Sequence, residues 1–474
     1  MTTVVTIDLG TSGTKAALWS DRGLVTMGRA PLTTAHPQPG WAEQDPTSWW
    51  RSVVDACDEV RAVAPEAWAD VSAVGFSAAR ETFTLVDAEL APVSPGILWS
   101  DQRAAMQATR LGDPAAIRAR TGVVLDGAAH AAKVAWVAEH EPNQLDAARW
   151  ILAPRDLVVA CLTGEIVTDP TLASRTGFFE LAGGWVPGAG ALVGDRLPRV
   201  VPPATVIGGV RAQPGAELGL RAGTAVVLGA GDRACEVLGT GTTVSQPMVS
   251  WGSTTNVSIP HPGPVEELPQ VAAVSRAAFS GFVVEAGVSA SGAALAWLAA
   301  LTDRTHDALL DVAATTEPGA RGAIALPWLN GARAPWWQPD THAAFLGLTG
   351  AHGSAELARA VIEGVAFDVA RSIELLAPDA VGLALAGGGA ANALWRAVLS
   401  ATTELPCTRR RHDEAASVGA RLIVGQALGE SLDVERLSPV VEQGEPDAAL
   451  VEVYRGIRRQ SDAAAAAVLG LEES

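Results

Sequence analysis

A short polar turn near the start of the chain has residue types suited to binding phosphate. It reads Asp8-Leu9-Gly10-Thr11-Ser12-Gly13-Thr14-Lys15. Glycine lets backbone N–H groups approach phosphate oxygens, the hydroxyls donate further hydrogen bonds, and Lys15 adds a positive charge. Asp8 ends an expected strand, where its carboxylate is suited to hold Mg²⁺ through water molecules. The turn therefore predicts a phosphate cradle, and an ordinary hairpin turn is the alternative.

The residues around this turn differ from a Walker A loop. The G-x-x-x-x-G-K-[ST] spacing is missing, and residues 14–19 read as a second strand where a Walker A loop would lead into a helix. Asp21-Arg22-Gly23 then reads as the next turn. The predicted cradle therefore lies in a β-hairpin.

A carboxylate follows an apolar strand in the middle of the chain, in the segment Gly229-Ala230-Gly231-Asp232-Arg233-Ala234. This segment loosely fits the G-x-G-x-x-A pattern of dinucleotide-binding folds, but Asp232 would direct its charge into the pyrophosphate cradle. A carboxylate at a strand end suits a general base instead, because phosphoryl transfer needs one group to orient and deprotonate the attacking hydroxyl. The alternative role for Asp232 is to cap the following helix.

Two further turns in the second half of the chain are rich in glycine or hydroxyls. Gly252-Ser253-Thr254-Thr255 separates two strand-like stretches and is a second candidate phosphate cradle. A strand over 382–386 runs into Gly387-Gly388-Gly389-Ala390, with Asn392 close behind. Three glycines between a strand and a helix permit flat contact with a purine or a ribose. The alternative for the second turn is a plain entry into a helix.

A charged pair lies between two short strands, in Ala78-Ala79-Arg80-Glu81-Thr82. An arginine beside a glutamate offers donors and acceptors suited to vicinal hydroxyls. The alternative is a solvated or mutually paired couple without a ligand.

The elements that position these turns are predicted from periodicity and capping. Asp45-Pro46 is a typical helix start, and apolar residues then recur at helical spacing. Further helices are expected over 131–140, 154–162, 290–301, 354–376, 391–402 and 414–428. The two hairpins with hydroxyl-bearing turns lie about 240 residues apart. They indicate a duplicated domain, with 1–244 as the first copy and 245–474 as the second.

Composition sets limits on the class of protein. The 474 residues are long enough for at least two cores, and 48% of them are apolar. A net charge of −18 argues against nucleic-acid and membrane-surface binding. The four cysteines are far apart, which predicts free thiols without a zinc site. No apolar stretch is long enough to cross a bilayer and no leader pattern precedes the first strand, so we expect a cytoplasmic protein.

Taken together and in this order, these segments resemble the FGGY family of carbohydrate kinases, which includes xylulokinases, gluconokinases and glycerol kinases. The resemblance covers essentially the whole chain. It is carried by residues 7–13, 40–46, 96–103, 162–165, 229–232, 326–335, 362–367 and 387–390.

The resemblance implies an α/β fold of two actin-like (ribonuclease H-like) ATPase domains with an interdomain cleft. It further implies ATP and Mg²⁺ as cofactors and a sugar, polyol or sugar acid as substrate, with a homodimer left open. Asp8 matches the family's metal-site aspartate, to which we add Asp232 as a metal ligand. Thr11, Ser12 and Lys15, with Gly10, match the first phosphate loop. Ser253 and Thr254, with Gly252, match the second. The segment 387–390, with Asn392, matches the adenosine loop.

The resemblance assigns Asp232 as the catalytic base and places the substrate near Arg80, Glu81 and Trp99. Arg80-Glu81-Thr82 looks like the Arg-Glu-Thr of glycerol kinases, whereas residues 40–46 and 97–103 look more like xylulokinases. Arg233 stands where the family usually has Asn, Gln or Gly. It has two interpretations: it binds an anionic group of the substrate, or it pairs with Glu81 or Glu236 and only shapes the pocket.

Three other classes of function compete with the kinase. A catalytically silent sugar or nucleotide sensor would not need both Asp8 and Asp232. An actin-like ATPase would not need the substrate-side segment 76–103. A dinucleotide oxidoreductase would need an acidic residue at the end of a second strand, and none is evident.

Overall fold

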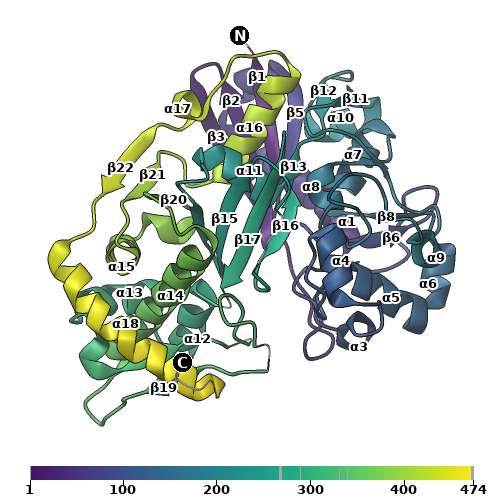
Figure 1. Ribbon diagram of the computed structural model, residues 1–474. Helices are drawn as coiled ribbons and strands as arrows, with labels where there is room; N and C mark the ends of the chain where they lie inside the picture. Colours follow the sequence, from purple (N-terminus) through teal and green to yellow (C-terminus); the bar gives the residue numbers. More distant parts are fainter. Residues whose placement is uncertain (1, 266–268, 289, 330, 339, 471–474) are drawn as a thin grey trace. The chain divides into compact units, whose positions relative to one another are not determined.

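A computed structural model describes residues 2–265, 269–288, 290–329, 331–338 and 340–470 (Figure 1). The chain divides into two compact units. The first comprises Met1–Gly239, Ala273–Val283 and Ala415–Ser438, and the second comprises Thr240–Ala272, Val284–Glu414 and Pro439–Ser474. A segment from late in the chain therefore completes the first unit. No helix within the described residues is long and apolar enough to cross a membrane.

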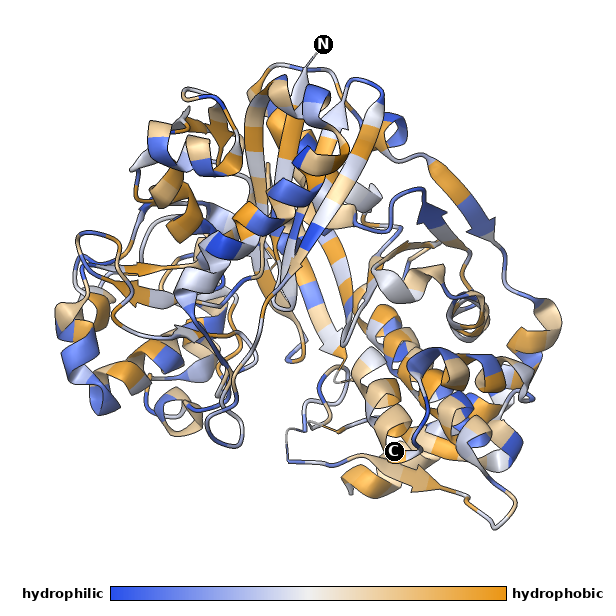
Figure 2. Cartoon of the chain, turned by 180° about the vertical axis from the view of Figure 1, so that it is seen from behind, coloured by the Kyte–Doolittle hydropathy of each residue, from blue (hydrophilic) through white to orange (hydrophobic). Residues whose placement is uncertain are grey.

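The first unit is built on a seven-stranded sheet with the order β11-β12-β5-β1-β2-β3, in which β13 also pairs with β5. Its strands are β1 (Thr3–Leu9), β2 (Gly13–Ser20), β3 (Gly23–Pro31), β5 (Val71–Ala78), β11 (Val206–Gly209), β12 (Ala225–Val227) and β13 (Ala230–Gly231). β1 pairs antiparallel with β2 and parallel with β5. All residues of β1 are buried, which is typical of a central strand covered on both faces. Apolar residues colour long stretches of these strands orange in Figure 2.

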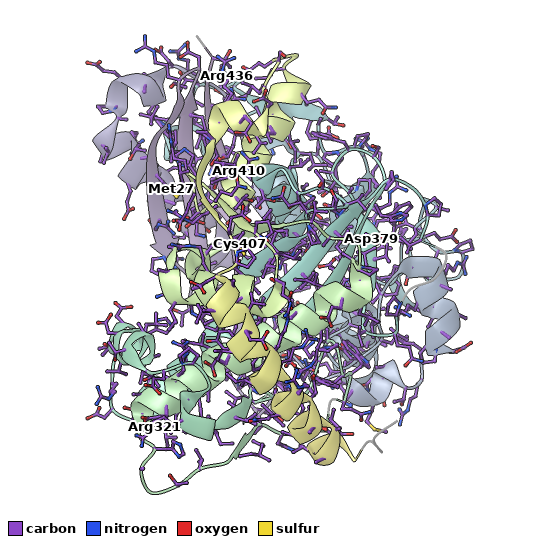
Figure 3. All side chains as sticks on the ribbon, turned by 60° about the vertical axis from the view of Figure 1, so that its left-hand side comes forward. Met27, Arg321, Asp379, Cys407, Arg410 and Arg436 are labelled. Carbon is purple, nitrogen blue, oxygen red and sulfur yellow. The ribbon has the colours of Figure 1, made fainter. Side chains whose placement is uncertain are left out.

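Helices cover this sheet. They are α1 (Pro46–Val63), α2 (Pro65–Ala69), α7 (Pro154–Thr163), α8 (Pro170–Ala173), α10 (Ala212–Leu218), α11 (Asp232–Thr240), α16 (Ala415–Ala427) and α17 (Val434–Leu437). The start of α1 was predicted correctly, because the side chain of Asp45 accepts a hydrogen bond from the backbone of Thr47 at 2.9 Å. The segment Ala415–Ser438 is held to the rest of the first unit by packing. Val418 of α16 lies in one apolar cluster with Trp19, and Met27, labelled in Figure 3, packs against this cluster.

A smaller group of short elements extends the first unit around residues 43–200. It consists of β4 (Glu43–Gln44), β6 (Thr84–Val86), β7 (Gly96–Ile97), β8 (Trp150–Leu152), β9 (Val167–Thr168), β10 (Arg199–Val200), α3 (Ala105–Ala108), α4 (Pro114–Thr121), α5 (His130–His140), α6 (Pro142–Ala147) and α9 (Gly190–Val193). Most of these elements share a core of their own, which includes Phe83, Ile97 and Val134. This group holds the segment that follows Arg80.

A second seven-stranded sheet has the order β16-β17-β15-β14-β20-β21-β22, and most of its strands belong to the second unit, whereas β16 and the start of β17 belong to the segment Ala273–Val283 of the first. Its strands are β14 (Met248–Trp251), β15 (Thr255–His261), β16 (Ala273–Arg276), β17 (Phe282–Val288), β20 (Leu383–Ala386), β21 (Cys407–Arg410) and β22 (Val440–Gly444), and β18 (Ile324–Leu326) pairs separately with β19 (Ala344–Leu346). Cys407 and Arg410, labelled in Figure 3, are the first and last residues of β21.

The helices of the second unit pack into one large apolar core. They are α12 (Gly292–Leu301), α13 (His306–Thr315), α14 (Ser354–Leu376), α15 (Ala393–Thr403) and α18 (Ala448–Leu469), with short 3₁₀ turns η1 (Ala320–Gly322) and η2 (Gly388–Ala391). The expected helices over 354–376, 391–402 and 414–428 are confirmed within two residues at each end. Residue 330, inside the 326–335 stretch noted above, lies outside the described residues.

The two units share one pattern of strand pairing around their hairpins. In the first unit, β1 pairs antiparallel with β2 and parallel with β5. In the second unit, β14 pairs antiparallel with β15 and parallel with β20. Each unit therefore presents a hairpin turn at the carboxyl end of a strand whose parallel neighbour ends at the same edge of the sheet.

Candidate active site

The first predicted phosphate cradle is a tight turn between β1 and β2. The backbone N–H of Gly10 donates to the carbonyl of Gly13 at 3.1 Å and closes the turn. Asp8 and Lys15 lie directly opposite each other in the antiparallel pair, so their side chains emerge on the same face, and Lys15 Nζ is 4.0 Å from Asp8 Oδ2. The turn therefore places a cation and a carboxylate beside hydroxyl and backbone groups.

This turn is tied to the expected substrate side of the same unit. The indole Nε1 of Trp99 donates to Thr11 Oγ1 at 2.8 Å, and Gln44 Nε2 donates to the carbonyl of Thr11 at 2.7 Å. A small hollow opens beside these residues, with Thr11, Thr82 and Leu98 in its lining. The structure thus brings together two predicted site residues, Thr11 and Trp99, that are 88 positions apart.

Asp232 is the first residue of α11, directly after β13. Its side chain is 37% exposed, so it is accessible to a ligand. Both preceding glycines are required by packing. Gly229 has φ 77°, and a Cβ there would collide with the carbonyl of Phe76. A Cβ on Gly231 would lie 2.8 Å from the side chain of Arg80. The G-x-G pattern is therefore explained by close contact within the unit, without a pyrophosphate.

The two predicted acidic residues emerge at the same edge of the first sheet. β1 and β13 both pair in parallel with β5, and Asp8 and Ala230 are both level with Ser77. The carboxyl ends of parallel strands meet at one edge, so Asp8 and Asp232 lie at the same edge of the sheet, at the ends of two strands that both pair with β5.

Arg80 and Glu81 are not paired with each other. Arg80 Nε donates to Asp232 Oδ1 at 3.1 Å, and the backbone N–H of Arg233 donates to the same oxygen at 2.6 Å. Glu81 turns the other way, and its Oε1 accepts from Nη2 of Arg175 at 2.6 Å. The interpretation of Arg80 and Glu81 as a mutually paired couple is therefore wrong, and Arg80 instead connects the substrate segment to Asp232.

Arg233 is paired with Glu236, one of the two acids named for it above. Its Nη1 donates to Glu236 Oε2, one turn further along α11. Each of three arginines in this region bonds an acid, in the pairs Arg80–Asp232, Arg175–Glu81 and Arg233–Glu236.

Two further residues of the site were missed by the sequence reasoning. One is Arg175, which had no local signal. The other is Lys133 of α5, for which the sequence analysis predicted no role. Lys133 is fully buried, and its Nζ donates to the carbonyls of Leu98 at 2.8 Å and Glu81 at 3.1 Å. Burial lowers the pKa of Lys133 to about 8.

The second predicted phosphate cradle is a turn between β14 and β15 in the second unit. The N–H of Gly252 donates to the carbonyl of Thr254 at 3.0 Å. The carbonyls of Gly252 and Ser253 accept hydrogen bonds from the first residues of α12, including Ala293 N–H at 2.9 Å from Ser253. The first N–H groups of α12 therefore bond the backbone carbonyls of this turn.

The expected adenosine loop packs against the same hairpin, because β14 and β20 are paired and Ser250 is level with Ala386. Gly387 has φ 79°, and a Cβ there would collide with the carbonyl of Trp251. A Cβ on Gly389 would lie 2.8 Å from that of Trp251, whereas one on Gly388 would meet no atom within 4 Å. Asn392 caps α15 by accepting from the N–H of Trp395 at 3.1 Å. Gly388 therefore leaves a bare surface, with no side chain over it, next to Gly387 and Gly389, which pack closely against Trp251.

Comparison with known proteins assigns the family. The model of the FGGY carbohydrate kinase N-terminal domain matches residues 3–239, and that of the C-terminal domain matches residues 247–428. The chain belongs to the FGGY family of carbohydrate kinases. Members of this family are phosphotransferases that use an alcohol group as acceptor, so this FGGY protein is a kinase acting on a sugar or polyol.

Individual relatives of this FGGY kinase span most of its length. It is 31% identical to the xylulose kinase of Escherichia coli strain K12, over 83% of each chain. It is 28% identical to the glycerol kinase of Acidovorax sp. strain JS42, over 92% of this chain and 93% of the relative. Among solved structures, the xylulose kinase of Rhodospirillum rubrum matches 98% of this chain and 99% of its own, with TM-score 0.86 and 27% identity. The expected two-domain α/β fold is confirmed.

The residues present fit ATP and Mg²⁺. No group of three or more His, Cys, Asp or Glu side chains suited to a metal ion occurs within the part of the chain that the structure describes. Mg²⁺ keeps several waters and binds one or two carboxylates together with substrate phosphates, so Asp8 and Asp232, at one edge of the first sheet, would suffice to hold it. The fit therefore rests on these two carboxylates near hydroxyl and backbone donors.

Proposed function

We propose that this FGGY kinase transfers the γ-phosphate of ATP to a hydroxyl of a neutral ketose or short polyol, with Asp232 as the general base. The observation that carries the proposal is the 3.1 Å hydrogen bond from Arg80 Nε to Asp232 Oδ1. A residue suited to binding acceptor hydroxyls thereby lies within reach of an accessible carboxylate. A hydroxyl held by Arg80 would be presented to Asp232 for deprotonation.

The acceptor is proposed to bind to Arg80, Glu81 and Trp99. The side chain of Glu81 supplies acceptor oxygens and Arg80 supplies donors, which together suit adjacent hydroxyl groups. Trp99 offers an apolar face for the carbon chain, while its Nε1 is engaged by Thr11. Residues 1–244 would thus form the acceptor-binding and catalytic part of the kinase.

The charge of this region favours a neutral acceptor. Each of the three arginines already bonds an acid, and Arg233 is engaged by Glu236. A carboxylate or phosphate on the acceptor would have to displace one of these acids and leave it without its partner, which is unfavourable. A sugar acid is therefore the second choice, and it would require Arg233 to leave Glu236.

The nucleotide is proposed to use both hairpin turns. Gly10, Thr11, Ser12 and Lys15 would contact its phosphates, and Gly252, Ser253 and Thr254 would contribute the second turn. When bound at Asp8 and Asp232, Mg²⁺ would neutralise charge on the phosphates. Residues 245–474 would hold the adenosine at Gly387, Gly388, Gly389, Ala390 and Asn392. The bare surface at Gly388 supports this assignment, because nothing there would obstruct a flat base.

A coupled assay of ADP release tests the proposal. The protein is mixed with ATP and Mg²⁺, and the acceptor panel contains ketoses, aldoses, polyols from glycerol to hexitols, and sugar acids. We expect turnover with a neutral ketose or polyol. Activity confined to sugar acids would overturn the neutral-acceptor proposal and assign Arg233 to anion binding. Tight ATP binding without turnover on any compound would contradict the kinase proposal and favour a sensor.

A further inference from the structure

Glu81 has a backbone conformation that needs support. Its φ is 64°, in the left-handed region that non-glycine residues rarely adopt. Such a residue persists only where surrounding contacts determine its conformation, and these positions are concentrated at functional sites. Two cations, Lys133 and Arg175, contact Glu81 in this conformation.

Lys133 holds the backbone of Glu81. Its ammonium group donates to the carbonyl of Glu81 at 3.1 Å and to that of Leu98 at 2.8 Å. These carbonyls directly precede Thr82 and Trp99, and Thr82 Oγ1 accepts from the N–H of Trp99 at 3.1 Å. One buried cation therefore joins the two segments from which the proposed acceptor residues project.

Arg175 holds the side chain of Glu81 from another direction. Its Nη2 donates to Glu81 Oε1 at 2.6 Å. Its Nε and Nη1 atoms are buried and have no hydrogen-bond partner among the described residues. Burying donors without partners costs stability, so Arg175 is poorly suited to a role in folding alone. Its one strong contact is with Glu81.

We propose that Lys133 and Arg175 are positioning residues that hold Glu81, by its backbone and its side chain respectively, in the conformation that binds the acceptor. The inference rests on the proposed function, because it assumes that Glu81 contacts acceptor hydroxyls. Neither cation reaches the reacting atoms in this scheme. Their contribution is to remove the need for Glu81 to change its backbone and side-chain angles when the acceptor arrives.

Three variants test the roles of these cations: Arg175→Met, Arg175→Lys and Lys133→Met. The KM for the acceptor and the KM for ATP are measured with glycerol and with xylulose, together with the thermal unfolding midpoint. For Arg175→Met we expect the acceptor KM to rise about tenfold or more, because a charge-assisted hydrogen bond is lost, with the ATP KM unchanged. Arg175→Lys keeps a cation near the single contacted oxygen, so we expect it to recover most of this loss.

Lys133→Met keeps most of the length of the side chain and removes its donors. We expect a rise in the acceptor KM of the same order as for Arg175→Met, also without a change in the ATP KM. The matched control is Arg359→Met in the second unit, where a buried arginine bonds Glu363 at 2.8 Å and the hydroxyl of Tyr454 at 2.6 Å. We expect the control to lower the unfolding midpoint while leaving the acceptor KM within twofold of wild type.

The outcomes separate this proposal from the function on which it depends. If the wild type phosphorylates neither glycerol nor xylulose nor another acceptor of the panel, the proposed function fails. If the wild type is active but Arg175→Met leaves the acceptor KM within twofold, or raises both KM values equally, the positioning role is wrong. Should Lys133→Met not fold, the pair of Arg175 variants still decides the question.

Discussion

Arg80 and Asp232 form an ion pair at the carboxyl edge of the first sheet, with Nε and Oδ1 3.1 Å apart. The side chain of Arg80 is largely buried, whereas that of Asp232 is 37% exposed. A ligand can therefore reach the carboxylate while Arg80 holds its Oδ1 atom. Gly231 permits this contact, because a Cβ there would meet the Arg80 side chain. The pair connects the acceptor segment with the proposed base.

Replacing Arg80 should impair both binding of the acceptor and the chemical step. For Arg80→Met we expect kcat/KM for the acceptor to fall by about 10²-fold, since a donor to the acceptor and a donor to Asp232 are lost together. The KM for ATP should not change. Steady-state kinetics with each substrate varied in turn measure both quantities, and an equal loss for both substrates would contradict the assignment.

Replacing Asp232 should remove the base and leave the fold intact. For Asp232→Asn we expect kcat to fall by about 10²–10⁴-fold, the range for loss of a general base. The amide oxygen can still accept from the N–H of Arg233, so the start of α11 is retained. Circular dichroism and calorimetric ATP binding provide the controls. Full turnover in this variant would show that Asp232 is not the base.

The glycine-rich loop of the second unit offers a matched pair of variants. Gly387→Ala should lower the unfolding midpoint, because a Cβ would collide with the carbonyl of Trp251 and φ is 79°. Gly388→Ala adds its methyl group in open space, so stability should be unchanged while the KM for ATP rises severalfold. Thermal unfolding and ATP titration distinguish the two effects. An unchanged ATP KM in Gly388→Ala would argue against adenosine binding at this loop.

Arg233 should contribute little to a neutral acceptor. Its guanidinium is engaged by Glu236, and both side chains are mostly buried. For Arg233→Met we expect the KM for a neutral acceptor to change by less than about threefold. The acceptor panel described above, repeated with this variant, provides the measurement. A selective loss of activity on a sugar acid would instead identify Arg233 as an anion-binding residue.

His130 should make the kinase less stable in mild acid. Burial, reinforced by the nearby charge of Lys133, lowers the pKa of His130 from 6.5 to about 3. Between these values the unfolded chain binds more protons than the folded one, so stability decreases as the pH falls from 6.5 toward 3. His130 stacks on Phe83 with ring centroids 4.3 Å apart, and a proton would place a charge in this apolar setting.

Removing the imidazole should flatten this dependence. From pH 6.5 to pH 5, we expect the wild type to lose ~2 kcal/mol of unfolding free energy more than His130→Gln does. Urea unfolding at the two pH values measures the difference. Identical losses in both proteins would show that His130 is not protonated on unfolding.

Local patterns predicted the elements around the site. The cap at Asp45, the long helix over 354–376 and the two hairpins depend on neighbouring residues, and the structure confirms each of them. The kinase family was likewise evident from the ordered set of motifs. Such features are readable because hydrogen bonding and apolar periodicity within an element act over a few residues.

The partners of the charged residues were not predictable in the same way. Arg175 lies 94 positions from Glu81, and Lys133 lies 52 positions from it. Arg80 meets Asp232 across 152 positions. No local pattern encodes such pairs, because they depend on which strands become neighbours and on how α5 and the segment after α8 pack against them.

The amino-acid sequence by itself determined the family, the repeated hairpins and the identity of the acidic and glycine-rich candidates, since each is a matter of residue type and short spacing. The tertiary structure decided which arginine faces which acid and that Gly229 and Gly231 serve close packing. It also decided that a buried lysine supports Glu81. The physical reason is that burial and charge pairing depend on neighbours in space, and these are set only when distant segments assemble into one core.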